Sequence, residues 1–382
     1  MTTTLTRPRR GLPSPVTPPR RGARRRKVTA LLAVLVVAAA VSALAYTGMA
    51  PVAPATPTAL ARADAKAFLH RYLTADGRVV RWDQHGDTVS EGQAYAMLLA
   101  VAVGKPAPFA RAWQWDRTHL QDADGLFAYR WAHGRVATAQ PATDADLDTA
   151  WALLLGSARF GNPAYRTAGL RVAAAVLSSE TATVGGRLQL VAGPWAVAAP
   201  TAMDPSYVSP EATAALDRAT GDQRWSQLST NATAMLGELP GRLPPNWVNL
   251  QPLRAVGAPA GTGTPAYGLD AQRLPVWQAA SCAPADRAAA AEDWRALSRT
   301  SGHGSAVAYT LSGHRVARTV NPLGWVATAA AADAAGHRQA TLSLLGRADR
   351  QAAVFHTYYG DAWTALGRVL LTTHWLTSCA TA

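Results

Sequence analysis

Apolar residues recur every three or four positions along almost the whole chain after Ala61, which is the spacing of helices with one buried face. The predicted helices cover eleven segments, at 62–73, 90–103, 107–119, 144–158, 162–179, 209–219, 222–237, 284–299, 324–336, 338–350 and 358–372. A twelfth is expected to begin near Asp270, whereas strand-like runs are few and the clearest covers 185–193. The pattern therefore predicts one all-α domain. Twelve helices suit helical hairpins arranged in a ring, although another α-solenoid would show the same pattern.

The N-terminal part of the chain has a different pattern. Residues 28–46 are nineteen uncharged and almost entirely apolar positions, about the length that crosses a bilayer as a helix. The basic tail over 1–27 predicts that this end lies in the cytoplasm. The apolar segment is then either a retained signal-anchor or a signal peptide cut near Ala59-Leu60-Ala61, and both place the later residues outside the cytoplasm. A Pro- and Ala-rich linker is expected over 47–61, followed by a single folded domain over 62–382.

Charge and composition narrow the class of partner and of chemistry. The formal charge is +13, but nine of the 37 Lys and Arg residues lie in the basic tail, which leaves only +4 on the rest. A domain whose positive and negative charges nearly balance is not typical of a nucleic-acid-binding protein. The chain has no HExxH motif, paired-His helix, GxSxG motif or phosphate-binding glycine loop, so no metal or cofactor is expected. Cys282 and Cys379 are the only cysteines, and in an exported domain they form either a disulfide or two buried free thiols.

A carboxylate at the start of a very apolar helix is the first candidate for chemistry. Ser90 and Gln93 have the spacing of a capping box, and Glu91 lies between them in the first turn. The helix dipole favours an acid there, and such acids are more often structural than catalytic.

Two further segments also place acids at helix starts. ATDADLDTAWALLL crowds Asp144, Asp146 and Asp148 at one helix entry, where like charges so close together repel each other. In LDAQRLPVW, Asp270 precedes Arg273 by three residues, and pairing between them would keep that acid ionised.

Three acid-bearing helix starts could converge at one end of a helical ring. Hydrolysis of a glycosidic bond needs two carboxyl groups of different pKa, one to protonate the leaving oxygen and one to activate water or attack the sugar. Tryptophans near helix ends agree with this interpretation because a pyranose presents an apolar face to an aromatic ring, although core packing accounts for most of them. They are Trp82, Trp113, Trp115, Trp131, Trp195, Trp247 and Trp277.

The ordered set of motifs resembles glycoside hydrolase family 8. SEGQAYAMLLAV, ATDADLDTAWALLL and LDAQRLPVW carry the resemblance, and ATDADLDTA is the most specific of them. YLTADGRVVRWD, DPSYVSPE, LPPNW and YYGDAWTALGRVLL extend it over nearly all of 62–382.

This resemblance implies an (α/α)6 barrel and an inverting, endo-acting hydrolase of β-1,4-linked glucan. By motif, Glu91 matches the general acid, Asp270 the base that activates water, and Asp144 the carboxylate that holds the sugar at the cleavage subsite. For Glu91 to stay protonated, burial and the charge of Asp144 have to raise its pKa. Inversion requires about 6.5–9.5 Å between the acid and the base. The further substrate-binding residues predicted are Asp146, Tyr207, Arg273, Tyr358 and, as a stacking platform, Trp131.

The chain departs from the family pattern near the base. Leu269 stands where many members carry Tyr, and the LPVW sequence that follows Arg273 is closer to members associated with bacterial cellulose synthesis. The expected partners are a β-glucan substrate, the membrane and an exopolysaccharide synthase, for a chain expected to be monomeric. The alternatives are a chitosanase, lichenase or xylanase of the same family, or an anchored glucan-binding protein without activity. The nearly balanced charge does not favour cationic chitosan.

Overall fold

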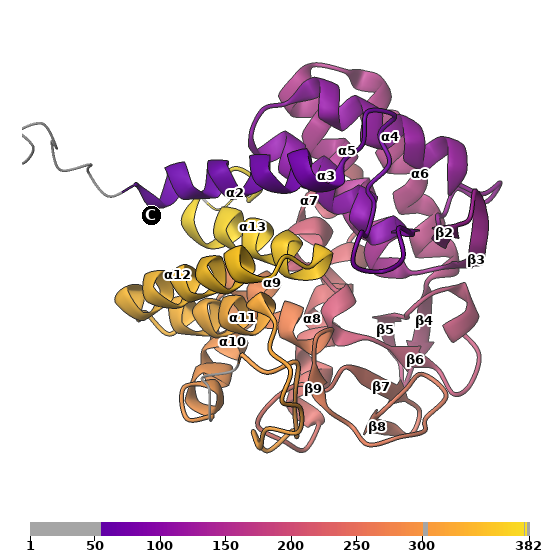
Figure 1. Cartoon of the computed structure of the whole chain (residues 1–382). Coiled ribbons are helices and arrows are strands. Elements are labelled where there is room, and N and C mark those ends of the chain that lie inside the picture. The colour runs from indigo at the N-terminus through magenta and orange to yellow at the C-terminus, as the bar shows by residue number, and fades with distance from the viewer. Residues whose placement is uncertain (1–54, 301–304, 378, 380–382) are drawn as a thin grey trace, which may run out of the picture. The chain divides into compact units, whose positions relative to one another are not determined.

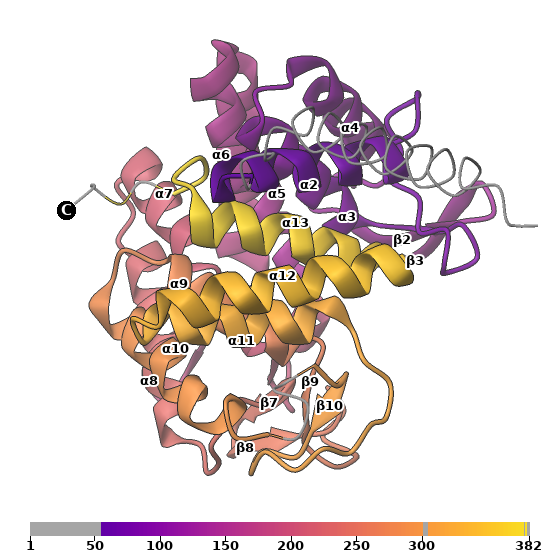
Figure 2. The same ribbon diagram turned by 60° about the vertical axis from the view of Figure 1, so that its left-hand side comes forward.

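Two rings of helices, one inside the other, form the part of the chain that the computed structural model describes, which is residues 55–300, 305–377 and 379 (Figure 1). Six inner helices contact one another in chain order, and the last of them returns to the first. They are α3 (Ser90–Ala102), α5 (Thr143–Phe160), α7 (Pro210–Thr220), α9 (Leu274–Ala280), α11 (Pro322–Ala334) and α13 (Tyr358–Thr372). Six outer helices alternate with them along the chain and pack against them (Figure 2). They are α2 (Pro57–Tyr72), α4 (Pro106–His119), α6 (Pro163–Ser179), α8 (Arg224–Glu238), α10 (Pro284–Leu297) and α12 (Arg338–Val354).

The predicted helical ring is therefore confirmed in the described part of the chain. Most helices begin and end within a few residues of their predicted bounds, because each presents a sustained apolar face. The exceptions are α2, which begins at Pro57 rather than at residue 62, and α9, which begins at Leu274 after a short 3-10 turn, η3 (Ala271–Arg273), rather than at Asp270.

The inner helices are apolar on almost every side, as expected for helices surrounded by others. In α3, every residue except Glu91 is buried. Small residues bring the inner helices close together. At Gly367 of α13, an added Cβ would lie 2.1 Å from Val326 Cγ1 of α11, so a larger side chain would force the two helices apart.

The first helix revises the predicted linker. α2 begins at Pro57, inside the segment assigned to a linker over 47–61, and the Thr56 hydroxyl caps it by accepting the Ala59 N–H at 3.1 Å. Ala61 is fully buried, so the Ala59-Leu60-Ala61 sequence is part of a folded helix. The predicted tail and apolar segment lie outside the described residues. Among the residues that are described, no helix has both the length and the apolar character needed to cross a membrane.

The connections between helices are unequal in length, and this decides where a site can form. Each connection from an inner helix to the next outer one is short, whereas those from outer to inner helices carry all ten strands found in the described residues. The long connections therefore gather where the inner helices begin. Their strands form two three-stranded antiparallel sheets, one hairpin and one further two-stranded antiparallel sheet. The sheets contain β1 (Thr88–Val89), β2 (Ala128–Ala132) and β3 (Arg135–Pro141), and β6 (Ala202–Met203), β7 (Trp247–Leu250) and β8 (Leu253–Val256). The hairpin pairs β4 (Thr181–Val184) with β5 (Arg187–Leu190). The other two-stranded sheet pairs β9 (Tyr267–Gly268) with β10 (Ala308–Tyr309), which lie in different connections.

The sequence pattern therefore predicted too few strands. The predicted run over 185–193 does form the second strand of a hairpin, turned by Gly185 and Gly186 at φ values of 58° and 78°. Most of the others are two to five residues long and are too short to show an alternating pattern.

The predicted capping box at α3 is wrong. Ser90 is already the first residue of the helix, and no side chain caps its start. The Gln93 side chain instead accepts the Val79 N–H at 2.6 Å and donates to the carbonyls of Gly77 and Ala112 at 3.0 and 3.1 Å. Gln93 is fully buried, so it is used to satisfy backbone groups of neighbouring segments.

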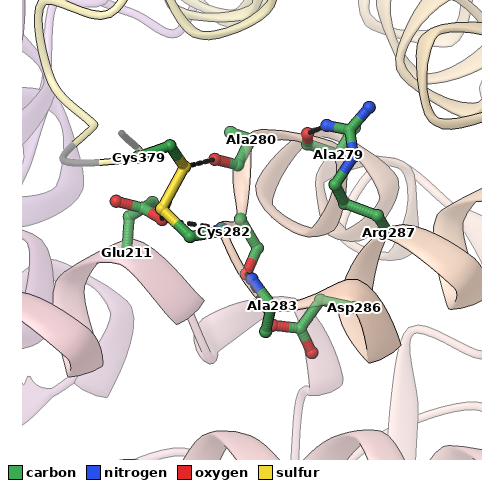
Figure 3. Close-up of a disulfide and its surroundings, with 9 residues drawn as sticks. Glu211, Ala279, Ala280, Cys282, Ala283, Asp286, Arg287 and Cys379 are labelled. Carbon is green, nitrogen blue, oxygen red and sulfur yellow. Dashed lines mark hydrogen bonds between the residues drawn. A yellow bond between two sulfur atoms is a disulfide. The ribbon is translucent and has the colours of Figure 1, made fainter. Parts of the chain in front are cut away.

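Cys282 and Cys379 form a disulfide that ties the C-terminal segment to the chain between α9 and α10 (Figure 3). The Glu211 carboxylate, at the start of α7, accepts the Cys282 N–H at 3.1 Å. In the described residues, these three side chains are the group whose ligand atoms lie close enough to hold a metal ion. Because the two sulfurs are bonded to each other, they are not thiolates and do not form a zinc site.

Candidate active site

A cleft of about 690 Å³ opens where the long connections meet the starts of α3, α5 and α13 and the turn η3. Its size is within the range of ligand-binding pockets. Three predicted acids, Glu91, Asp144 and Asp270, all line it. The aromatic residues around them are Tyr129, Trp195, Tyr207, Trp247, Tyr358 and Tyr359.

One buried cation, Arg273, lies within 4 Å of two of these acids and of a third carboxylate, that of Asp204. Its Nη1 atom lies 2.6 Å from Asp144 Oδ2 and 3.5 Å from Glu91 Oε2. Its Nη2 atom lies 3.6 Å from Asp204 Oδ2. The side chain is only 2% exposed, so the cation is paired with carboxylates rather than with water.

The predicted pairing of Arg273 with the Asp270 carboxylate is therefore wrong. Arg273 Nε lies 3.5 Å from the main-chain carbonyl of Asp270, while the guanidinium group extends across the ring to Asp144 of α5. Residues 270–273 form a tight 3-10 turn instead of the predicted helical turn, and the nearest strong anion comes from a different helix.

Neighbouring side chains fix the position of the guanidinium group. Arg273 donates to Ser206 Oγ from Nε at 3.1 Å and to the Tyr95 hydroxyl from Nη1 at 3.3 Å. The Ser206 hydroxyl and N–H both donate to Asp204, at 2.7 and 2.8 Å. The Tyr207 ring lies 5.2 Å from the guanidinium carbon, within the range of a cation–π contact.

The environment of Glu91 is suited to a proton donor. Burial and, to a smaller extent, the charge of Asp144 raise its pKa to about 7, with Arg273 partly opposing both effects. The expected causes, burial and Asp144, are thus confirmed. Glu91 is still 16% exposed, so its carboxyl group reaches the cleft. Burial also raises the pKa of Asp270, with Arg273 lowering it and Asp144 raising it.

Comparison with known proteins shows which family has this arrangement. The sequence model for glycosyl hydrolases family 8 matches residues 38–373, which is most of the chain. The chain belongs to glycosyl hydrolase family 8.

Two curated relatives agree with the assignment to family 8. A "Probable endoglucanase" of Novacetimonas hansenii is 34% identical over 232 residues, covering 55% of this chain and 64% of the relative. An "Endoglucanase" of Cellulomonas uda is 31% identical over 232 residues, covering 58% of this chain and 64% of the relative. The matched region therefore spans somewhat less than two thirds of each relative.

Solved structures share the fold. The endo-β-1,4-glucanase CMCax from Acetobacter xylinum superposes with a TM-score of 0.68 at 27% identity, covering 82% of this chain and 98% of that one. A β-1,3-1,4-glucanase from Paenibacillus sp. X4 gives a TM-score of 0.74 at 20% identity, covering 85% and 95%, which shows the fold alone.

Three of the five predicted substrate-binding residues of this family 8 chain line the cleft: Tyr207, Arg273 and Tyr358. Tyr358 packs closely over α3, because an added Cβ at Gly92 would lie 2.7 Å from its hydroxyl oxygen. The glycine next to Glu91 therefore lets this tyrosine come close to the acid.

Asp146, which was predicted to bind substrate, does not line the cleft. It is fully buried outside the cleft lining, and its Oδ1 atom accepts the Phe127 N–H at 2.8 Å. Burial raises its pKa well above the ordinary value, and the neighbouring Glu180 carboxyl adds to the shift. Two residues along a helix correspond to about 200° of rotation, so Asp146 points away from the face that carries Asp144.

Trp131 is also absent from the cleft lining. Its ring packs edge-on against Trp115 and His119, at centroid distances of 5.7 and 5.1 Å. Tyr129, two residues earlier, lines the cleft instead. Strand β2 has irregular register on both sides of Arg130, which breaks the alternation by which a sequence predicts the facing side chains.

Other lining residues come from turns, from strand β3 and from the start of α13, and the sequence did not single them out. They are Arg81, Asp83, Gln84, Thr138, Gln140, Pro141, Ala142, Pro259 and Tyr359. Trp195 and Trp247 were among the tryptophans considered for sugar binding, and both line the cleft, whereas Trp113, Trp115 and Trp277 are buried in the core. Some of these lining residues lie within quoted motifs, but no periodicity shows which of their side chains face the cleft.

Proposed function

We propose that the chain is an inverting, endo-acting hydrolase of β-1,4-linked glucan. The observation that carries this proposal is the shared cleft of Glu91 and Asp270, with the pKa of Glu91 raised to about 7. Near neutral pH such a residue can hold the proton that a leaving sugar oxygen needs. The printed names of the Cellulomonas uda relative and the Acetobacter xylinum structure, an endoglucanase and an endo-β-1,4-glucanase, support the choice of substrate.

In the proposed reaction, the Glu91 carboxyl donates its proton to the glycosidic oxygen as the bond from that oxygen to the anomeric carbon breaks. A water molecule attacks the anomeric carbon from the opposite face of the ring, and Asp270 takes the proton that this water loses. The new bond lies on the opposite face from the old one, so the configuration is inverted. We expect a carboxyl separation of about 6.5–9.5 Å, which leaves room for the water.

Asp144 and Arg273 would prepare the site for this reaction. The negative charge of Asp144 favours the protonated form of Glu91, and its carboxylate can also accept a hydrogen bond from a hydroxyl group of the sugar at the cleavage point. Arg273 balances that charge and is held rigidly by Ser206 and Tyr95. Trp195, half exposed at the cleft wall, can stack on a sugar ring.

The test compares the wild type with Glu91→Gln on carboxymethyl-cellulose, lichenan, xylan and chitosan. We expect cleavage of β-1,4-glucan with the α-anomer appearing first by NMR. We expect the variant to lose about a thousandfold or more in kcat while still binding oligosaccharide. A β-anomer as first product would exclude inversion, and loss of binding in the variant would indicate a structural acid.

We also propose that the domain acts outside the cytoplasm, either anchored through residues 28–46 or secreted. The disulfide supports this location because disulfides persist in oxidising compartments. Attachment to the membrane and association with a polysaccharide synthase remain predictions. Fractionation of cells expressing the full chain, with the disulfide state measured by thiol alkylation, tests the location. A reduced cytoplasmic protein would contradict it.

A further inference from the structure

Two exposed tryptophans near the cleft are held in the same way. Trp195 is 42% exposed, lines the cleft, and donates from Nε1 to the Pro141 carbonyl at 3.0 Å. Trp82 is 60% exposed and donates from Nε1 to the Arg71 carbonyl at 3.1 Å. In each case the polar edge of the indole is tied to the backbone while much of the ring stays open to solvent.

Trp82 lies in a turn between residues that line the cleft. Arg81, Asp83 and Gln84 all line the cleft, so Trp82 is at its rim. The turn is well supported, because the Asp83 carboxylate accepts the Tyr358 N–H at 3.1 Å. Arg81 forms an ion pair with Asp87 at 2.7 Å, which holds the other side of the turn.

The Trp82 ring has no stacking partner within the described residues. No aromatic ring or cation there lies over it, unlike Trp325 and Trp375, which are each covered by an arginine. A fixed, uncovered indole beside hydrogen-bonding side chains is a suitable surface for a pyranose, which has an apolar face and a rim of hydroxyl groups. The preformed geometry would lower the entropy lost on binding.

We propose that Trp82 is an outer sugar-binding platform that holds one further pyranose of a long β-glucan chain beyond the central cleft. Asp83 and Gln84, next to it, can accept and donate hydrogen bonds to the hydroxyl groups of that sugar. This inference rests on the proposed function only for the class of ligand. It predicts that kcat/KM increases with the length of the glucan substrate, which the acids of the central cleft do not explain.

Trp82→Ala and Trp82→Phe separate stacking from anchoring of the turn. We expect Trp82→Ala to lower the ratio of kcat/KM on carboxymethyl-cellulose to kcat/KM on cellotetraose by about three- to tenfold. Trp82→Phe keeps a ring but loses the bond to Arg71, and should recover most of the ratio. Val316→Ala, which truncates an equally exposed side chain outside the cleft lining, should leave the ratio unchanged. Equal losses on both substrates, or a Phe variant as poor as the Ala variant, would overturn the proposal.

A binding assay keeps this proposal distinct from the hydrolase proposal. Retention by soluble glucan polymer in native gels is compared between Glu91→Gln and Glu91→Gln/Trp82→Ala. If the wild type binds glucan without cleaving it, the hydrolase proposal fails, while weaker retention of the double variant still supports the platform. Unchanged retention of the double variant, or no retention of any of these proteins, would overturn the platform.

Discussion

Arg273 sets the charge balance of the cleft at the scale of single residues. It is one buried cation within reach of carboxylates from Glu91, Asp144 and Asp204, so the acids around it cannot all be ionised without unbalanced charge. Burial and Asp144 favour a proton on Glu91, and Arg273 limits that effect. A donor and a nearby anion can thus coexist although both begin helices whose dipoles favour negative charge.

Asp144→Asn tests this balance. Removing the charge of Asp144 removes one cause of the raised pKa of Glu91 and leaves Arg273 closest to Glu91, so the pKa of Glu91 should fall. A general acid works only while protonated, and the wild type should lose activity as pH rises through about 7. In the variant we expect kcat about a hundredfold lower and the basic limb of kcat/KM at lower pH. If the basic limb of the kcat/KM profile stayed at the wild-type pH, Asp144 would not be raising the pKa of Glu91. Asp124→Asn, an exposed acid in a turn, serves as the control.

At the scale of elements, the start of α5 shows how one helix supplies two unrelated acids. Asp144 faces the cleft, whereas Asp146 faces the interior beside Glu180 at the C-terminal end of α6. Burial raises the pKa of Glu180 to about 8. Two buried carboxyl groups in contact are more stable when they share a proton than when both are charged.

This pair should make stability fall with rising pH. The pKa of Glu180 is higher in the folded state than in the unfolded chain, so protonation favours folding. That contribution is complete below about pH 4 and is lost as pH rises through about 8. Urea unfolding should therefore give a lower free energy of unfolding at pH 9 than at pH 6. Asp146→Asn should reduce this difference, because its amide can donate to an ionised Glu180, whereas Asp124→Asn should behave like the wild type. If the free energy of unfolding had the same pH dependence in the wild type and in Asp146→Asn, the shared proton would be excluded.

At the scale of the whole domain, the elements that stabilise the fold and the residues that line the cleft lie in different regions. The acids and aromatic residues sit where long connections enter the inner helices, and the helical rings hold those connections in position. The disulfide lies outside the cleft lining and closes a loop with a sequence separation of 97 residues. It ties the last described segment to the body of the rings (Figure 3).

Reducing this disulfide should weaken the domain without changing its chemistry. Cross-linking so long a loop limits the unfolded chain, so we expect a loss of roughly 2–5 kcal/mol in the free energy of unfolding. Urea titration with and without reductant measures it, and the Cys282→Ser/Cys379→Ser variant should be insensitive to reductant. Activity of the folded, reduced protein should stay near the wild-type value. Unchanged stability on reduction would show that the unfolded chain gains no freedom from losing the cross-link.

Much of the fold could be predicted because helices repeat their pattern over many residues. The long apolar helices were found close to their observed bounds, whereas strands such as Thr88–Val89 are too short to have a pattern at all. The start of α2 was missed because Pro57 and the alanines after it are equally typical of a linker. Near the site, Glu91 and Asp144 were found through motifs at helix starts, but Arg81 and Tyr129 come from a turn and an irregular strand.

The sequence by itself determined the helices, the family and the acids that reach the cleft, because each depends on neighbouring residues and ordered motifs. Only the tertiary structure decided which charged side chains form ion pairs with one another. Arg273 could have paired with Asp270 by spacing, yet it pairs with Asp144 of another inner helix. Electrostatic energies depend on distance in space and on burial, and both are settled only when residues far apart in the chain meet inside the ring.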